Sequence, residues 1–274
     1  MSKRNTQAAK TAARERLRAE REREAKRAKV KRQVTVAVSV VAVLAAAGGI
    51  GYAVVQANKP GHWEAVKDEK LVKPANTTGT DGTTVVIGKS TAKKTLAMYE
   101  DPRCPVCAAF EQTVGQTVKK DVDEGKYKIQ FVGATFIDTN IPGEGSRNAL
   151  SALGAALNVS PEAFLEYKAA LYSAKYHPEE QDDKFKDDAY LIKVADTVGA
   201  LKNNAAFQKA VKDGTYDKWA LVMSEKFDKD GQKYDFQGTP TLVMDGKKVT
   251  GSDGKNAPMT VEEFTTAIDK ALKG

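Results

Sequence analysis

Residues 99–111 read YEDPRCPVCAAFE, and this stretch decides how the rest of the chain is interpreted. It contains Cys104 and Cys107, the only two cysteines in the 274 residues. From the second cysteine onward, apolar residues recur at steps of three, four and four, the spacing of one helix face: Cys107, Phe110, Val114 and Val118. The two cysteines therefore stand at the predicted start of a helix.

This position predicts chemistry for the pair. Side chains three residues apart on a helix are neighbours, and their α-carbons are close enough to form a disulfide with little backbone movement. The unpaired N–H groups and the positive dipole end of the helix stabilise a thiolate at Cys104. A purely structural disulfide is disfavoured, because so short a loop constrains the unfolded chain weakly. The pair is predicted to be a redox centre.

No metal and no cofactor are expected at the pair. Zinc needs four ligands, and only His62 and His177 remain, without ligand spacing. Covalent haem attachment would need a histidine after the second cysteine, where Ala108 stands. The chemistry is expected to rest on the two sulfur atoms.

The elements around the pair predict an α/β fold. Short strands are expected at 84–88 and 94–100 before the pair and at 127–133 after its helix. Helical periodicity then dominates from about 145 to 229. Strand signals return at 239–244 with a hairpin turn after them, and a last helix follows.

Taken together, YEDPRCPVCAAFE and GTPTLVMDG at 238–246 resemble the DsbA-like branch of the thioredoxin superfamily. The resemblance runs from about Val85 to Leu272. It implies a thioredoxin-like fold with an inserted helical domain, and it implies a thiol:disulfide oxidoreductase. Within that resemblance, Cys104 matches the nucleophilic cysteine and Cys107 matches the resolving cysteine.

The resemblance extends to further site residues. Thr239 and Pro240 match the dipeptide of the family's cis-proline, which faces the redox pair and helps to bind an extended substrate. Asp101 matches an acidic position and is expected to assist proton transfer near Cys107. The alternative that Asp101 simply caps the helix stays open, since proline follows it.

The dipeptide between the cysteines departs from the strongly oxidising members of the family. Those members often have histidine where this chain has Val106, and valine supplies no cation. Arg103 is the nearby residue available to add one. We therefore expect a reduction potential between that of thioredoxin, roughly −270 mV, and that of DsbA, roughly −120 mV.

The distribution of charge argues against a nucleic-acid partner. The formal net charge is +7, but residues 1–32 hold 13 Lys or Arg against 4 Glu, whereas the other residues hold 30 against 32 Asp or Glu. A domain that binds nucleic acid needs clustered cations on its own surface. The basic segment is better interpreted as a determinant of membrane topology.

A membrane anchor is predicted at residues 33–56. Residues 34–55 carry no charge and would span about 33 Å as a helix, enough to cross a bilayer. The positive-inside rule makes 1–32 a basic cytoplasmic tail, 57–83 an extracytoplasmic stalk with Trp63 at the interface, and 84–274 an extracytoplasmic domain. This describes a single-pass protein of the cell membrane. A cleaved signal peptide remains an alternative that exports the same domain.

These features predict an enzyme that forms disulfides in exported proteins, with the thiols of those proteins as substrates. The resemblance implies reoxidation by a DsbB-like or VKOR-like membrane partner. A reductase or isomerase on the same fold, serving cytochrome maturation or disulfide repair, is the nearest alternative. A non-catalytic extracytoplasmic binding module is the alternative from another class.

Overall fold

The computed structural model describes residues 10–24, 26–29, 31–33 and 61–273. The chain divides into two units, Met1–Gly61 and His62–Gly274. In the first unit the described residues before Gly61 are helical and exposed. This agrees with a charged segment that has no apolar face to bury.

The second unit is built on a five-stranded sheet with the order β1-β3-β2-β4-β5. β2 (Thr95–Glu100) runs parallel to β3 (Lys128–Gly133), and the other neighbours are antiparallel. The remaining strands are β1 (Val85–Ile87), β4 (Thr241–Met244) and the two-residue β5 (Lys247–Lys248). The strands predicted from alternation are thereby confirmed.

Alternation along β2 gives the sheet two apolar faces. Leu96 and Met98 lie in the core under α3 (Pro105–Glu124) and α10 (Val261–Lys273). In this core the rings of Phe110 and Phe264 pack edge to face, with their centroids 6.0 Å apart. Ala97 and Tyr99 lie on the opposite face with the larger core. The redox pair begins α3, directly after the buried central strand.

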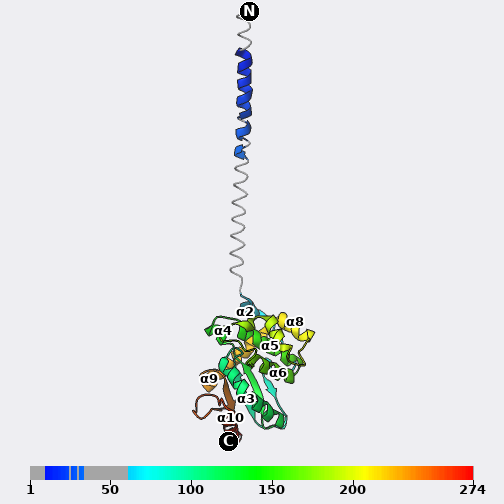
Figure 1. Cartoon of the computed structure of the whole chain (residues 1–274), viewed down its shortest axis with the longest axis vertical. Helices are drawn as coiled ribbons and strands as arrows, with labels where there is room; N and C mark the ends of the chain where they lie inside the picture. The colour runs from blue at the N-terminus through cyan, green and yellow to red at the C-terminus, as the bar shows by residue number, and fades with distance from the viewer. Residues whose placement is uncertain (1–9, 25, 30, 34–60, 274) are drawn as a thin grey trace, which may run out of the picture. The chain divides into compact units, whose positions relative to one another are not determined.

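A helical insertion covers that opposite face, between β3 and β4 in the chain (Figure 1). It contains α4 (Ile137–Asn140), α5 (Gly145–Val159), α6 (Pro161–Tyr172), η2 (Lys184–Lys186), α7 (Asp188–Ala195), α8 (Ala205–Lys212) and α9 (Asp217–Tyr234). These helices extend beyond the predicted range of 145–229 on both sides.

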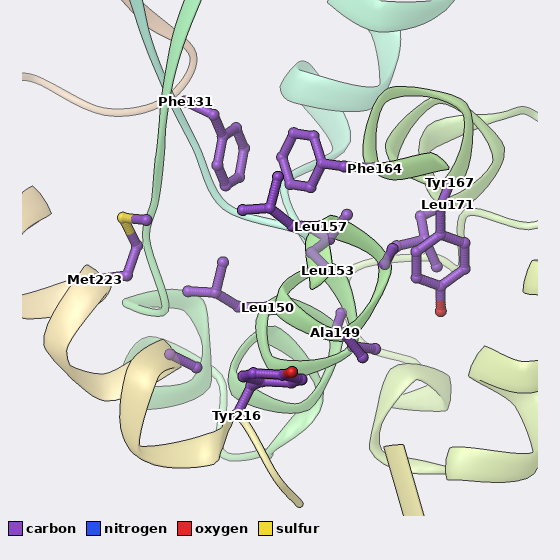
Figure 2. Close-up of a cluster of buried hydrophobic side chains, with 14 of the residues drawn as sticks. Phe131, Ala149, Leu150, Leu153, Leu157, Phe164, Tyr167, Leu171, Tyr216 and Met223 are labelled. Carbon is purple, nitrogen blue, oxygen red and sulfur yellow. The ribbon is translucent and has the colours of Figure 1, made fainter. Parts of the chain in front are cut away.

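The insertion is joined to the sheet by a large buried core. Figure 2 shows Phe131 of β3 facing Phe164 of α6, whose ring centroids are 5.1 Å apart. Leucines of α5 fill the space below these rings, at Leu150, Leu153 and Leu157. Sheet and insertion therefore form one apolar interior, in which a shift of one part is felt by the other.

Part of the predicted stalk packs onto the insertion. Trp63 of α2 (His62–Ala65) is 5% exposed, and the guanidinium of Arg147 lies 5.2 Å from its ring centre. Val66 of η1 (Val66–Asp68) is fully buried. The expected interfacial position of Trp63 is therefore wrong, because its indole is enclosed by the domain's own side chains.

The predicted membrane span lies, apart from its first residue, outside the described residues. Among the helices that the structure describes, none has both the length and the apolar character needed to cross a bilayer.

Candidate redox site

The first cysteine caps the helix that it precedes. Cys104 is the N-cap of α3, and its Sγ accepts a hydrogen bond from the backbone N–H of Cys107 at 3.4 Å. Pro105 occupies the first turn, where a missing N–H does no harm. The sulfur thus takes the place that a serine or aspartate oxygen holds in most helix caps. Both cysteines are free thiols in this structure.

The environment separates the two sulfurs electrostatically. Hydrogen bonding with Cys107 lowers the pKa of Cys104 to about 6, against the opposing effect of burial, and contacts with Thr239 and the N–H of Val106 add to the shift. Burial raises the pKa of Cys107, which has no exposed surface, and the adjacent Cys104 sulfur adds to that shift. Near neutral pH, Cys104 is a thiolate and Cys107 a thiol.

The predicted Thr239-Pro240 dipeptide faces the pair. Its peptide bond is cis, and the carbonyl oxygen of Thr239 lies 3.4 Å from Cys104 Sγ. A groove of about 490 Å³ starts here, with Val106 and Pro240 beside the sulfur and Leu242, Val249 and Met259 among its apolar lining. The structure thereby brings together residues more than a hundred positions apart in the chain.

Asp101 lies next to the pair in sequence but faces the insertion. Its carboxylate is fully buried and accepts hydrogen bonds from Ser146 Oγ at 2.6 Å and from the N–H groups of Arg103 and Ile137 at 3.0 and 3.1 Å. Burial raises its pKa to about 7. The capping alternative is wrong, because Cys104 caps the helix itself. The proposed role of Asp101 in proton transfer stays a prediction.

A buried charge cluster beside the sulfurs was not predicted. Glu100 at the end of β2 is fully buried, with Lys168 Nζ 2.9 Å from its Oε2 and the same Nζ 2.7 Å from Glu111 Oε2. Burial raises the pKa of Glu100 to about 7 against the attraction of Lys168, and Glu100 contributes to the raised pKa of Cys107. A carboxyl that titrates near neutral pH is suited to exchange a proton with a buried thiol.

The expectation that Arg103 adds a cation to the thiolate is wrong. Its guanidinium points away from the sulfur into the insertion, where Nη1 lies 2.9 Å from Asp138 Oδ1. The carboxylate neutralises the charge, and Arg103 is absent from the interactions that lower the pKa of Cys104.

In the part of the chain that is described, no three His, Cys, Asp or Glu side chains are grouped so that they could hold a metal ion.

A family model described as Thioredoxin matches residues 80–270. Disulfide bond formation protein D of Bacillus subtilis is 28% identical over 195 residues, which cover 69% of this chain and 77% of that protein. The serine/threonine-protein kinase PknE of Mycobacterium tuberculosis is 25% identical over 168 residues, 60% of this chain but only 29% of the kinase.

Solved structures extend these similarities. The reduced DsbA of Mycobacterium tuberculosis is 26% identical to this chain, with a TM-score of 0.52. The match covers 69% of this chain and 100% of the Mycobacterium tuberculosis chain. BdbD of Bacillus subtilis in its oxidised form has a TM-score of 0.56 over 74% of this chain and 100% of its own, at 22% identity, so that likeness concerns the fold alone.

Proposed function

The chain belongs to the thioredoxin family and is a DsbA-like thiol:disulfide oxidoreductase, and on that premise we propose that it forms disulfide bonds in exported proteins. Cys104 is the nucleophilic cysteine in this proposal and Cys107 is the resolving cysteine. The observation that carries the assignment is the geometry at the amino end of α3, where Cys104 Sγ caps the helix and Cys107 is fully buried. The pKa shifts of the two cysteines run in opposite directions for these reasons.

Oxidation of a substrate begins with the disulfide form of the pair. A substrate thiolate attacks Cys104 Sγ, a new bond joins the two proteins, and Cys107 leaves with the electron pair of the broken S–S bond. Burial disfavours the Cys107 thiolate, so it takes up a proton. Glu100 is the carboxyl proposed to supply that proton.

The second step releases the oxidised substrate. Another thiolate of the substrate attacks the substrate sulfur of the mixed disulfide, and Cys104 leaves as a thiolate. Its low pKa makes Cys104 a good leaving group. The protein has gained two electrons and the substrate has lost them. A membrane protein of the DsbB or VKOR type is the proposed acceptor that restores the disulfide.

The groove beside Cys104 suits an extended polypeptide. Val106 is 48% exposed at its edge, and the backbone carbonyl of Thr239 stands at the sulfur. A peptide lying there would meet apolar side chains such as Leu242 and Val249 together with polar ones such as Gln237 and Asn256, a mixed lining that does not demand one sequence. Broad acceptance of exported proteins is consistent with this lining.

The proposed location rests on sequence features. The uncharged run at 34–55 and the basic residues before it support a membrane anchor with the catalytic domain outside the cytoplasm. The similarity to a disulfide bond formation protein supports an oxidising compartment as well. An anchor would raise the effective concentration of the domain at a membrane-bound acceptor.

Trapping of mixed disulfides tests the assignment of the two sulfurs. In cells, Cys107→Ser should accumulate mixed disulfides with exported proteins, because the Cys107 thiol that would break the bond between Cys104 and the exported protein is missing. Cys104→Ser should accumulate none. Equal trapping by both variants would refute the roles.

The direction of electron flow needs a second measurement. The redox state of the pair in intact cells, read by thiol trapping, should be mainly disulfide for an oxidase. A mainly dithiol state would favour the reductase or isomerase alternative. Absence of both mixed disulfides and turnover of a dithiol substrate would favour a binding module.

A further inference from the structure

The helical insertion adds several attachments to the short turn before Cys104, whose own hydrogen bonds run to Asp101 from the N–H groups of Cys104 and Arg103, at 2.9 and 3.0 Å. Tyr172 Oη donates a hydrogen bond to the carbonyl oxygen of Asp101 at 3.1 Å, and His177 Nε2 lies 3.1 Å from the carbonyl oxygen of Pro102. The third residue of the turn, Arg103, is tied down by its side chain. The turn follows β2 of the thioredoxin sheet, and side chains of the insertion help to fix its path.

Arg103 makes the deepest of these attachments. Its side chain is 1% exposed, although arginine is almost never fully buried unless paired. Nη1 lies 2.9 Å from Asp138 Oδ1 and 3.4 Å from Asp183 Oδ1, and it donates to the carbonyl oxygen of Ile141 at 3.3 Å. Nη2 donates to the carbonyl oxygen of Glu180 at 2.8 Å. One guanidinium thus joins two separate segments of the insertion, residues 138–141 and residues 180–183.

Asp138, the main partner, is itself rigidly held. Its two oxygens accept hydrogen bonds from the backbone N–H groups of Ser146 and Arg147 at 2.9 and 3.0 Å. Arg147 Nε adds a contact at 3.1 Å. Glycine at position 143 leaves the space that the guanidinium occupies, since an added Cβ there would lie 2.5 Å from Arg103 Nη1. The site is built closely around this arginine.

A buried ion pair of this kind is weak evidence for stability. Removing two charges from water costs several kcal/mol per ion, about as much as the pair recovers, and apolar side chains of similar volume often do as well. What the pair does supply is a fixed position. Arg103 directly precedes the cysteine whose sulfur must meet the first N–H groups of α3.

We propose that Arg103 is a positioning residue of the redox site, which fixes the turn against the insertion and thereby sets how Cys104 Sγ meets the N–H groups at the start of α3. It acts through geometry, because its charge is already neutralised by Asp138. Cys104 Sγ accepts the N–H of Cys107 at 3.4 Å, and an outward shift of the turn would lengthen and weaken this hydrogen bond. The proposal rests on the proposed role of Cys104 as the reactive thiolate.

A role of Arg103 through its charge and a role through its position predict opposite effects of Asp138→Asn on the pKa of Cys104. If Arg103 acted through its charge, Asp138→Asn would expose more of that charge and lower the pKa of Cys104. If Arg103 acts by holding the turn, Asp138→Asn releases the guanidinium, loosens the turn and raises the pKa. Arg103→Lys keeps the cation but lacks the planar fork that reaches both segments at once, so it should raise the pKa of Cys104 too.

The experiment measures thiolate absorbance of Cys104 against pH in the reduced full-length protein, with Cys104→Ser identifying the signal. We expect Arg103→Met, Arg103→Lys and Asp138→Asn each to raise the pKa of Cys104 toward that of an ordinary thiol. A tenfold weaker acidity of the thiol lowers the alkylation rate by about fivefold at pH 6 and by about tenfold well below pH 6, because only the thiolate reacts. Arg147→Met is the matched control, because it removes an arginine from the same carboxylate without touching the turn, and it should leave the pKa unchanged.

Two results would overturn the proposal: a lowered Cys104 pKa in Asp138→Asn, or a wild-type value in Arg103→Lys. Thermal unfolding is followed in all variants, and Arg103→Lys decides the matter if Arg103→Met does not fold. A wild-type Cys104 pKa near that of a free thiol would instead refute the proposed function, so the two failures are distinguishable.

Discussion

The depressed pKa of Cys104 predicts how the stability of the reduced protein depends on pH. The pKa is about 6 in the folded protein against 9.0 for an ordinary cysteine, which the unfolded chain regains. Because the pKa of Cys104 is lower in the folded protein than in the unfolded chain, ionisation of this thiol adds to the free energy of unfolding. This contribution is complete above about pH 9 and is lost as the pH falls through about 6. Replacing Cys104 by serine removes this contribution at every pH.

Its size follows from the two pKa values. Linkage gives about 1.4 kcal/mol at pH 7 and about 2.7 kcal/mol at pH 8, with a slope approaching about 1.4 kcal/mol per pH unit. The same stabilisation of the reduced form makes the disulfide more oxidising, by about 30 mV at pH 7 for a two-electron couple.

Urea unfolding of the fully reduced protein between about pH 5.5 and 8.5 tests this, with the free energy of unfolding of Cys104→Ser subtracted from that of the wild type. Glu100 and Asp101 have pKa values raised to about 7, so their own contributions are lost as the pH rises through this range. Both proteins contain them, so their effects largely cancel in the difference.

Cys107→Ser is the control. Burial raises the pKa of Cys107, so that sulfur itself stays protonated over the range. A serine hydroxyl at 107 can still donate to Cys104 Sγ, so the difference between this variant and the wild type should vary with pH far less than the difference for Cys104→Ser. The reasoning fails if the wild type and Cys104→Ser differ by a constant amount from pH 6 to 8, or if the divergence starts only above about pH 8.5.

Three further predictions concern neighbouring features. Val106→His places a titratable cation beside the thiolate, so it should lower the pKa of Cys104 and raise the reduction potential. At pH values above the pKa, the potential should rise by about 30 mV for each tenfold gain in thiol acidity. Thiolate absorbance measures the pKa and equilibration with glutathione measures the potential, and the prediction is contradicted if neither quantity moves. Lys168→Met leaves Glu100 buried without its cation and should destabilise the protein by about 3–5 kcal/mol in denaturant unfolding at pH 8. The loss should be smaller at pH 5, below the raised pKa of Glu100, where that carboxyl is protonated; equal losses at both pH values would argue against the ion pair as the cause. For topology, protease added to intact spheroplasts should degrade the domain and spare residues 1–32, and the reverse pattern would overturn the proposed orientation.

Much of the redox site could be predicted from local sequence. The spacing of Cys104 and Cys107 at the start of an apolar helical stripe identified the pair, and the structure places Cys104 at the N-cap of α3. The Thr239-Pro240 dipeptide was found by resemblance and is cis and adjacent to Cys104. Alternation identified the strands, because a half-buried strand exposes alternate side chains to different surroundings.

Charged residues near the pair were the least predictable part. Proximity along the chain suggested Arg103, and the family resemblance suggested Asp101, as neighbours of the sulfurs, yet both side chains turn into the insertion. The acidic residue that interacts with Cys107 is Glu100, whose cation comes from Lys168 on α6. Nothing in the local pattern distinguishes Lys168 from a solvated lysine.

The sequence by itself determined the reactive sulfurs, the start of their helix and the order of the elements, because these depend on periodicity and on contacts within a few residues. Only the tertiary structure decided which charges meet. A buried charge takes the partner that packing brings within about 3 Å, and that partner can come from any distance along the chain. Arg103 with Asp138 and Glu100 with Lys168 are such pairs, and each ties the thioredoxin sheet to the inserted helices.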